Sequence, residues 1–386
     1  MKQMIYADNA ASTRVSDAAM AAMTPFFTRY YGNPSATHSL GKKSSEALLE
    51  ARETISSLLG CLPGEITFAS GGSESDNQAL ISAAYLGAQH NKRHIVSSAF
   101  EHHAILHTLE KLKNMGFEIT LLTPDSKGFI HPEDLESVLG SRSDTCLVTL
   151  MYANNEIGTV QPVAQLGQIC HSYGVLFHSD AVQAAGHLPI DVNADNLDML
   201  SLSAHKFHGP KGAGLLYARR GTHITSLIEG GAQERGKRAG TENMPAVVGM
   251  AVALKESCHN MSKASDKLRV LGSRLIYGLS QIPGSYLNGD AETRLPGNVN
   301  FSFDKTEGET LVVLLDQMGI CVSSGSACAA GSLEPSHVLL SIGRSPELSG
   351  ASLRISLSEE NTMEEVEYII KSVREAVLRI RNVSSR

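Results

Sequence analysis

Lys206 is the residue whose neighbours most favour covalent chemistry. It lies in Ser203-Ala204-His205-Lys206-Phe207-His208-Gly209-Pro210, directly after the apolar run 199–202. A lysine at the end of a buried strand can be desolvated and held at a lowered pKa, and such an amine forms a Schiff base with an aldehyde. Taken alone, the segment also fits a basic surface turn, so the neighbouring motifs must decide.

Cys328 is the second candidate, within Ser323-Ser324-Gly325-Ser326-Ala327-Cys328-Ala329-Ala330-Gly331-Ser332. A stretch this small, polar and glycine-rich predicts a mobile surface loop. A cysteine there escapes burial, so thiolate chemistry becomes the reason for its presence. Cys321, on the preceding apolar run, is expected in the core. None of the six cysteines forms a Cys-x-x-Cys pair, which disfavours zinc-ribbon and thioredoxin-like sites.

Asp180 ends the apolar run 175–178 and is followed by Gln183. A carboxylate at that point could pair with a pyridinium nitrogen and keep it protonated, so that the ring acts as an electron sink. Gln183 could reach a ring hydroxyl. The alternative is that Asp180 only caps the N-terminus of a helix.

Glycines and hydroxyls occur together in Ser70-Gly71-Gly72-Ser73-Glu74-Ser75, which follows a predicted strand and opens a predicted helix. Free N–H groups and the helix dipole make such a terminus a phosphate site. The segment lacks the Gly-Lys-Ser/Thr of a Walker motif. Helix capping explains the serines equally well.

Two further polar segments follow predicted strands, Glu101-His102-His103 and Asn154-Asn155-Glu156-Ile157-Gly158. We expect the His102 imidazole to stack on a cofactor ring, with a hydrogen-bonded structural histidine as the alternative. His103 and His107 would share one helical face, but a metal site there lacks an obvious carboxylate ligand. Asn155 offers an amide to a ring substituent, or the segment is merely a turn.

The elements that must position these residues alternate between strands and helices. Several of the β-rich runs are continuously apolar, which is typical of parallel strands covered on both faces. The runs are 66–68, 94–96, 119–122, 147–150, 175–178, 199–202 and 215–217. Helical patterns such as 46–59 lie between them, which favours a doubly wound α/β sheet with its ligands at the carboxyl ends of the strands. After about Glu256, strands at 299–303 and 353–357 and helices at 307–317 and from Met363 predict a smaller α+β domain.

Composition excludes several classes of protein. The 386 residues carry 33 Lys+Arg against 40 Asp+Glu, and 42% are hydrophobic, so a packed core is expected and wholesale disorder is excluded. A net charge of -7 with no basic block disfavours nucleic acid or an anionic membrane as partner. No apolar run approaches the roughly 18 residues of a membrane span. The start of the chain lacks the apolar core of a signal peptide, so a cytoplasmic protein is expected.

Taken together, these segments resemble the cysteine desulfurases, in the class V aminotransferase branch of the fold-type I pyridoxal-phosphate (PLP) enzymes. The resemblance covers essentially the whole chain. It rests on the strand-end motifs above, the cysteine segment, and Asp8-Asn9-Ala10-Ala11-Ser12-Thr13, Gly32-Asn33-Pro34-Ser35, Gly230 to Asn243 and Ser352-Leu353-Arg354-Ile355-Ser356-Leu357.

The resemblance implies a role for each matching residue. Lys206 would form the Schiff base with PLP, and Cys328 would take up sulfur as a persulfide. Around the ring, the implied contacts are Asp180 with the pyridine nitrogen, Gln183 with the hydroxyl, His102 on the face and Asn155 alongside. The implied phosphate contacts are Gly72, Ser73, Ser203, His205 and, from a partner subunit, Thr241. Arg354, together with Asn33, would hold the substrate carboxylate.

The implied activity is conversion of L-cysteine to L-alanine with sulfur left on the enzyme, in a homodimer. Sulfur acceptors in the family include iron–sulfur scaffold proteins and tRNA-thiolation proteins. No intrinsic metal is expected, although Cys328 could transiently ligate an iron–sulfur cluster with a scaffold partner. The expected division is an N-terminal segment 1–15 that joins the small domain, a large domain 16–256 and a small domain 257–386 that carries the cysteine loop. The alternatives are a selenocysteine lyase, an aminotransferase or a non-catalytic scaffold.

Overall fold

The computed structural model describes residues 4–325 and 335–384. Its largest sheet has seven strands in the order β2-β8-β7-β6-β5-β3-β4, and each of the seven predicted apolar runs overlaps one of them. The strands are β2 Ile66–Ala69, β3 His94–Ser98, β4 Glu118–Leu122, β5 Thr145–Thr149, β6 Leu176–Asp180, β7 Met199–Ser203 and β8 Gly214–Ala218. Strand β8 is antiparallel to β2 and β7, and the other neighbours are parallel. The predicted α/β class is therefore confirmed.

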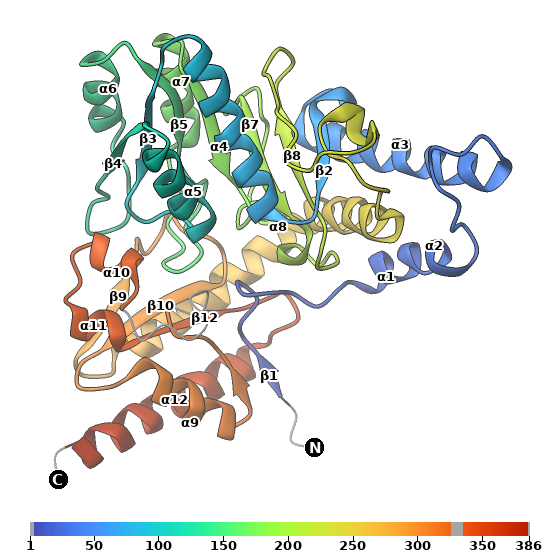
Figure 1. The fold of residues 1–386 in the computed structure, drawn as a ribbon. Helices are drawn as coiled ribbons and strands as arrows, with labels where there is room; N and C mark the ends of the chain where they lie inside the picture. Colours follow the sequence, from blue (N-terminus) through green and yellow to red (C-terminus); the bar gives the residue numbers. More distant parts are fainter. Residues whose placement is uncertain (1–3, 326–334, 385–386) are drawn as a thin grey trace.

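Helices cover both faces of this sheet (Figure 1). Ile95 and Leu147 belong to the hydrophobic core that includes α4 and α5, whereas the adjacent Val96 and Val148 belong to the core that includes α3 and α7. Burial of successive residues on opposite faces is the pattern of a doubly wound sheet. The helices of this part are α1 Asp17–Met23, α2 Pro25–Thr28, α3 Ser39–Leu59, α4 Gly72–Gln89, α5 His103–Asn114, α6 Pro132–Gly140 and α7 Val163–Ser172, with 3-10 turns η1 Pro63–Glu65, η2 Ala204–Lys206 and η3 Gln233–Gly236.

The rest of the chain forms a smaller α+β unit, as predicted. A second sheet has the order β12-β10-β9, and a parallel pair joins β1 near the N-terminus to β11. Ile5 and Ala7 are buried in the same core as this unit, so the N-terminal segment packs with it. The elements are β1 Ile5–Tyr6, β9 Ser285–Asn288, β10 Asn298–Phe303, β11 Ile320–Cys321, β12 Ser352–Ser356, α9 Gly308–Gln317, α10 His337–Ser341, α11 Pro346–Gly350 and α12 Met363–Ser384.

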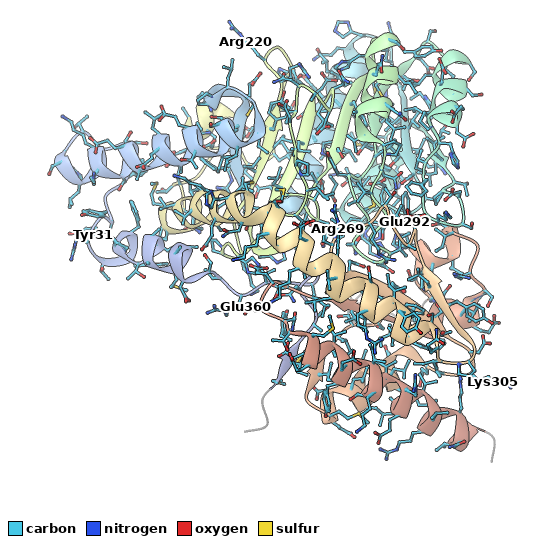
Figure 2. The ribbon with its side chains drawn as sticks, turned by 180° about the vertical axis from the view of Figure 1, so that it is seen from behind. Tyr31, Arg220, Arg269, Glu292, Lys305 and Glu360 are labelled. Carbon is cyan, nitrogen blue, oxygen red and sulfur yellow. The ribbon has the colours of Figure 1, made fainter. Side chains whose placement is uncertain are left out.

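One helix, α8 Met244–Ser280, connects the two units over 37 residues. Met250 and Leu254 are buried in the core of the large sheet, and Leu271 and Leu275 in the core of the smaller unit. Figure 2 shows α8 from behind, with Arg269 labelled along the helix. The division of the chain at residues 15 and 256 remains a prediction, and its second boundary falls inside this continuous helix. Neither α8 nor any other helix of the described residues is long and apolar enough to cross a membrane.

Candidate active site

Polar residues from five strand ends surround one cavity of about 310 Å³. Small-molecule sites span roughly 300–1,000 Å³. Nine of the ten residues that the resemblance assigns to the cofactor line this cavity: Gly72, Ser73, His102, Asn155, Asp180, Gln183, Ser203, His205 and Lys206. They come together because the strands β2, β3, β5, β6 and β7 present their carboxyl ends at the same edge of the sheet.

The N-terminus of α4 forms one end of the cavity. Gly71 occupies the N-cap position, so no side chain caps the first N–H groups of the helix. A Cβ atom at Gly72 would lie 2.6 Å from Cγ2 of Val182, so only glycine fits there. Arg238 neutralises the acidic Glu74 of the first turn, with its Nε 3.0 Å from Oε1. The donors and the space suit an anion at this end of the cavity.

Asp180 lies at the other end, on the last position of β6. Its side chain is 7% exposed, and its Oδ1 accepts the N–H of Val182 at 2.9 Å. The following residues form turns rather than a helix, so the helix-cap alternative is wrong. Burial raises the pKa of the Asp180 carboxyl, while His102 and Lys206 act in the opposite direction. The net shift of the Asp180 pKa is upward, and the neighbouring groups oppose it in favour of the ionised form that a pyridinium nitrogen needs.

Lys206 ends η2 and reaches toward the N-terminal segment. Its Nζ donates to the carbonyl oxygens of Ala10 at 2.6 Å and Ala11 at 2.9 Å. Gln183 Nε2 donates to the same Ala10 oxygen at 2.9 Å. The N-terminal segment therefore holds two of the predicted cofactor residues in place from across the cavity.

The two cavity histidines differ in what fixes them. His102 is the N-cap residue of α5, and its Nδ1 accepts the N–H of Ala104 at 3.1 Å. Burial, with Lys206 and Lys211 nearby, lowers the pKa of His205 to about 4, so this imidazole is neutral near pH 7.

His103 and His107 place their ring centroids 5.1 Å apart, yet in residues 4–325 and 335–384 no group of three possible metal ligands includes either.

Arg354, predicted to bind the substrate carboxylate, is fully buried on β12. Its Nη2 lies 2.9 Å from Oδ1 of Asp8, and its Nη1 donates to the Asn155 carbonyl at 3.2 Å. Arg354 therefore contacts the backbone of the cavity residue Asn155, and its positive charge is paired with Asp8. The pairing of Asp8 with Arg354 was not predicted from the sequence, because the two residues lie 346 positions apart.

Two predicted residues, Asn33 and Thr241, lie elsewhere. Asn33 is exposed, and its Oδ1 accepts the N–H of Ser35 at 2.8 Å. Thr241 is exposed just before α8, and neither residue lines the cavity. Cys328 falls outside the described residues. The roles of these three residues remain predictions.

The expectation that Cys321 lies in the core is wrong. Cys321 is half-buried on β11, because Ile320 takes the inward position and successive residues of a strand point to opposite sides. Burial raises the pKa of the Cys321 thiol, with Asp316 and Asp8 acting in the same direction. Its thiolate is therefore disfavoured at neutral pH.

The buried carboxyl of Glu156 bonds to residue 336 and lies close to residue 325, on either side of the segment 326–334. Ser336 donates to Oε2 of Glu156 at 2.6 Å, and the Gly325 N–H donates to the Ser352 hydroxyl at 3.3 Å. A Cβ atom at Gly325 would lie 3.2 Å from the same Oε2. We call Glu156, Gly325, Ser336, Ser352 and Arg354 the Glu156 junction. Burial raises the pKa of Glu156 to about 7, although the Ser336 hydroxyl and Arg354 lower it.

Asp76 also lines the cavity and was missed in the sequence analysis. It follows Gly72 by four residues in α4, so both residues lie on the same side of the helix. That spacing was visible in the sequence, and it was the signal that could have identified Asp76.

Comparison with known proteins agrees with this geometry. Residues 5–369 match the family model described as aminotransferase class-V. The chain is 46% identical to the cysteine desulfurase IscS of Methanosarcina thermophila, over 98% of this chain and 93% of that protein. Among solved structures, a NifS-like protein is 38% identical with a TM-score of 0.90, covering 97% of this chain and 99% of the other. SspA in complex with cysteine is 36% identical with a TM-score of 0.81, covering 92% and 98%. The chain therefore belongs to the class V aminotransferase family.

Proposed function

We propose that this chain is a PLP-dependent cysteine desulfurase, which converts L-cysteine to L-alanine and leaves the sulfur on Cys328 as a persulfide. The observation that carries the proposal is the grouping of Lys206, Asp180 and an uncapped helix N-terminus around one cavity. The relatives named above are cysteine desulfurases, and one similar solved structure contains cysteine. Both findings support the same substrate.

The residues of the cavity fit PLP at both ends. Its phosphate suits the free N–H groups of α4 and the hydroxyls there, and its pyridine nitrogen suits the buried carboxylate of Asp180. The chemistry that PLP supplies when bound is an aldehyde for amines and a ring that takes up negative charge from the substrate α-carbon. The residues that would hold it are Gly72, Ser73, Ser203 and His205 at the phosphate, with Asp180, Gln183, His102, Asn155 and Lys206 around the ring.

The side chains of this chain then have separate tasks. The Lys206 amine takes the α-proton of cysteine and later returns a proton to the product. The Cys328 thiolate attacks the sulfur of the substrate, so that an S–S bond forms while the Cβ–S bond breaks. The electron pair of the broken bond stays with the substrate carbon, and protonation there gives alanine. Arg354 holds the carboxylate of the substrate.

We further propose a cytoplasmic homodimer that passes the sulfur to an iron–sulfur scaffold or a tRNA-thiolation protein, without contacting nucleic acid or a membrane. Thr241 is exposed and outside the cavity, which supports its predicted role in the cavity of a second subunit. Phe27 in α2 and Tyr31 just after it are 63% and 69% exposed, and a second copy would cover this apolar surface. Figure 2 labels Tyr31. Sedimentation of the purified protein tests the dimer.

The test of the activity is cysteine turnover by the purified, PLP-loaded protein, with alanine and sulfide measured together. We expect equal amounts of both when a thiol reductant releases the persulfide. Keto-acid formation that does not depend on Cys328 would indicate an aminotransferase, and a strong preference for selenocysteine would indicate a lyase. A protein without a visible PLP absorption band and without turnover would be a non-catalytic scaffold.

A further inference from the structure

Asp76 is a second buried carboxyl beside Asp180. Its side chain is 1% exposed, and its Oδ1 has no hydrogen-bond partner within the described residues. One oxygen of Asp76, one oxygen of Asp180 and one ring nitrogen of His102 all lie within 4.8 Å of one another. Two carboxylates this close in a buried site cannot both ionise without a large electrostatic cost.

His102, at the start of α5, has a ring nitrogen within 4.8 Å of both carboxyls and lowers the pKa of Asp180. Among the described residues of the neighbouring strands, the groups that face Asp76 add no positive partner. From β6, His178 places Nε2 3.8 Å from Oδ1, but burial lowers the pKa of His178 to about 3, so its ring is neutral. From β7, the Ser201 hydroxyl faces the carboxyl of Asp76 and lies 3.0 Å from the same His178 nitrogen. From the end of β3, Glu101 adds a second acidic group. Burial raises the pKa of Asp76 well above its usual range, and Asp180 and Glu101 act in the same direction, while the Ser201 hydroxyl opposes them.

Asp180 has the opposite surroundings, although it belongs to the same pair. Its Oδ1 accepts the Val182 N–H, and His102 and Lys206 both favour its ionised form. The two carboxyls are therefore not equivalent. The proton of the pair belongs on Asp76 and the charge on Asp180.

We propose that Asp76 is a positioning residue that stays protonated, so that the buried pair carries one negative charge and that charge remains on Asp180. The importance of this charge for catalysis rests on the proposed function, because Asp180 would face the pyridine nitrogen. Whether Asp76 carries a proton does not depend on turnover. It can be detected in the full chain with or without PLP.

The first experiment is infrared spectroscopy of the full-length protein, with and without PLP, as the pH is raised through neutrality. A protonated carboxylic acid has a C=O stretch that a carboxylate lacks. We expect the parent to show this band at pH 7 and Asp76→Asn to lose one component of it. Glu101→Gln is the matched control, because burial raises the pKa of Glu101 to about 8 and its own component should disappear separately.

Asp180→Asn completes the comparison. Removal of the neighbouring charge should let Asp76 ionise at lower pH, so the Asp76 component should disappear earlier in the titration. A band that persists in Asp76→Asn and is lost in Asp180→Asn would place the proton on Asp180 and overturn the proposal. Stabilisation of the PLP-free parent by Mn²⁺, absent in Asp76→Asn, would show two ionised carboxylates and would also overturn it.

The second experiment measures PLP affinity and the pH dependence of its absorption band. Asp76→Asn preserves a neutral group, so its Kd for PLP should stay within about tenfold of the parent value. In the parent, the absorption band should change as Asp76 ionises at alkaline pH, and in Asp76→Asn this change should be absent. A loss of affinity in Asp76→Asn much greater than tenfold would contradict a neutral Asp76. These outcomes are independent of sulfur transfer, so a protein that binds PLP but does not desulfurate cysteine can still confirm the assignment.

Discussion

The cofactor cavity and the Glu156 junction are built in different ways. The cavity is assembled from strand ends of one sheet, and Asp180 is fixed there by a short-range bond to Val182, although Lys206 and Gln183 also bond to Ala10 of the N-terminal segment. The junction joins segments far apart in the chain, and Glu156 and Ser336 lie 180 positions from each other. The first region is determined mainly by the fold of the large sheet, with the N-terminal segment closing it, whereas the second depends on how the two units meet. Substitutions in the cavity should therefore change chemistry, and those in the junction should change binding and pH dependence.

The largest effect is expected in the cavity, from Lys206→Ala. Lysine is the side chain here that can both form a Schiff base and move the α-proton, so cysteine turnover should fall by at least about 10⁴-fold. The measurement is alanine formation, with the absorption spectrum of bound PLP recorded in parallel. Lys211→Ala, on the same segment but exposed and outside the cavity, is the matched control and should remain active. An active Lys206→Ala protein would refute the assignment.

The second prediction, for Cys328→Ser, distinguishes the nucleophile from the residues that bind PLP in the cavity. Cys328→Ser should keep PLP bound, because its contacts come from the cavity, but sulfur transfer should stop. A serine hydroxyl is scarcely ionised at neutral pH and cannot form a persulfide. The experiment is reaction with sulfur-labelled cysteine and mapping of the label by mass spectrometry under non-reducing conditions.

Cys321→Ala is the control for that experiment. Its thiol is half-buried with a raised pKa, so the label should still be found on Cys328. Label on Cys321 in the parent, or normal alanine formation by Cys328→Ser, would mean that the nucleophile is a different residue.

A smaller effect is expected where the junction meets the cavity, from Arg354→Ala. Loss of the carboxylate anchor should raise the KM for cysteine by about 10- to 100-fold, from the roughly 1.5–3 kcal/mol of a hydrogen bond to a charged group. Asp8→Asn should act in the opposite direction on KM, since Asp8 occupies the same guanidinium. An unchanged KM in Arg354→Ala at normal turnover would assign the carboxylate to another group.

The smallest effect concerns stability and pH at the junction. The pKa of Glu156 is raised to about 7 in the folded protein, so its stabilising contribution is full at acid pH and is lost as the pH rises from about 4.5 toward 7. Glu156→Gln should therefore gain stability relative to the parent over that window, by at most roughly 3 kcal/mol. Thermal unfolding at several pH values measures it.

Glu101→Gln provides the comparison for Glu156→Gln, because the folded-state pKa of Glu101 is about 8. The stability of Glu101→Gln relative to the parent should therefore keep rising to about pH 8, one unit beyond the pH at which the gain of Glu156→Gln levels off. Identical pH profiles for the two variants would show that Glu156 does not titrate separately from Glu101.

The grouping of nine assigned residues around one cavity could be predicted because its physical basis is the position of each residue at a strand end. Apolar runs identified the seven strands, and polar residues at their ends meet wherever parallel strands share an edge. The same reasoning could not find the ion pair of Arg354 with Asp8, since nothing local in either segment requires the other. It placed Cys321 in the core because an apolar run does not show which of two neighbours points inward. The expected domain boundary near residue 256 remains a prediction, and α8 continues through that position.

The N-terminal segment has a consequence for how the protein folds. Ala10 donates its N–H to the Ser356 hydroxyl at 2.9 Å, and β1 pairs with β11. The same Ala10 accepts from Lys206, so the site is complete only when segments 346 positions apart have come together. Until then the large sheet can fold, but its lysine lacks the carbonyl groups that orient it. Competence for catalysis is therefore expected to appear late in folding, when this long-range contact forms.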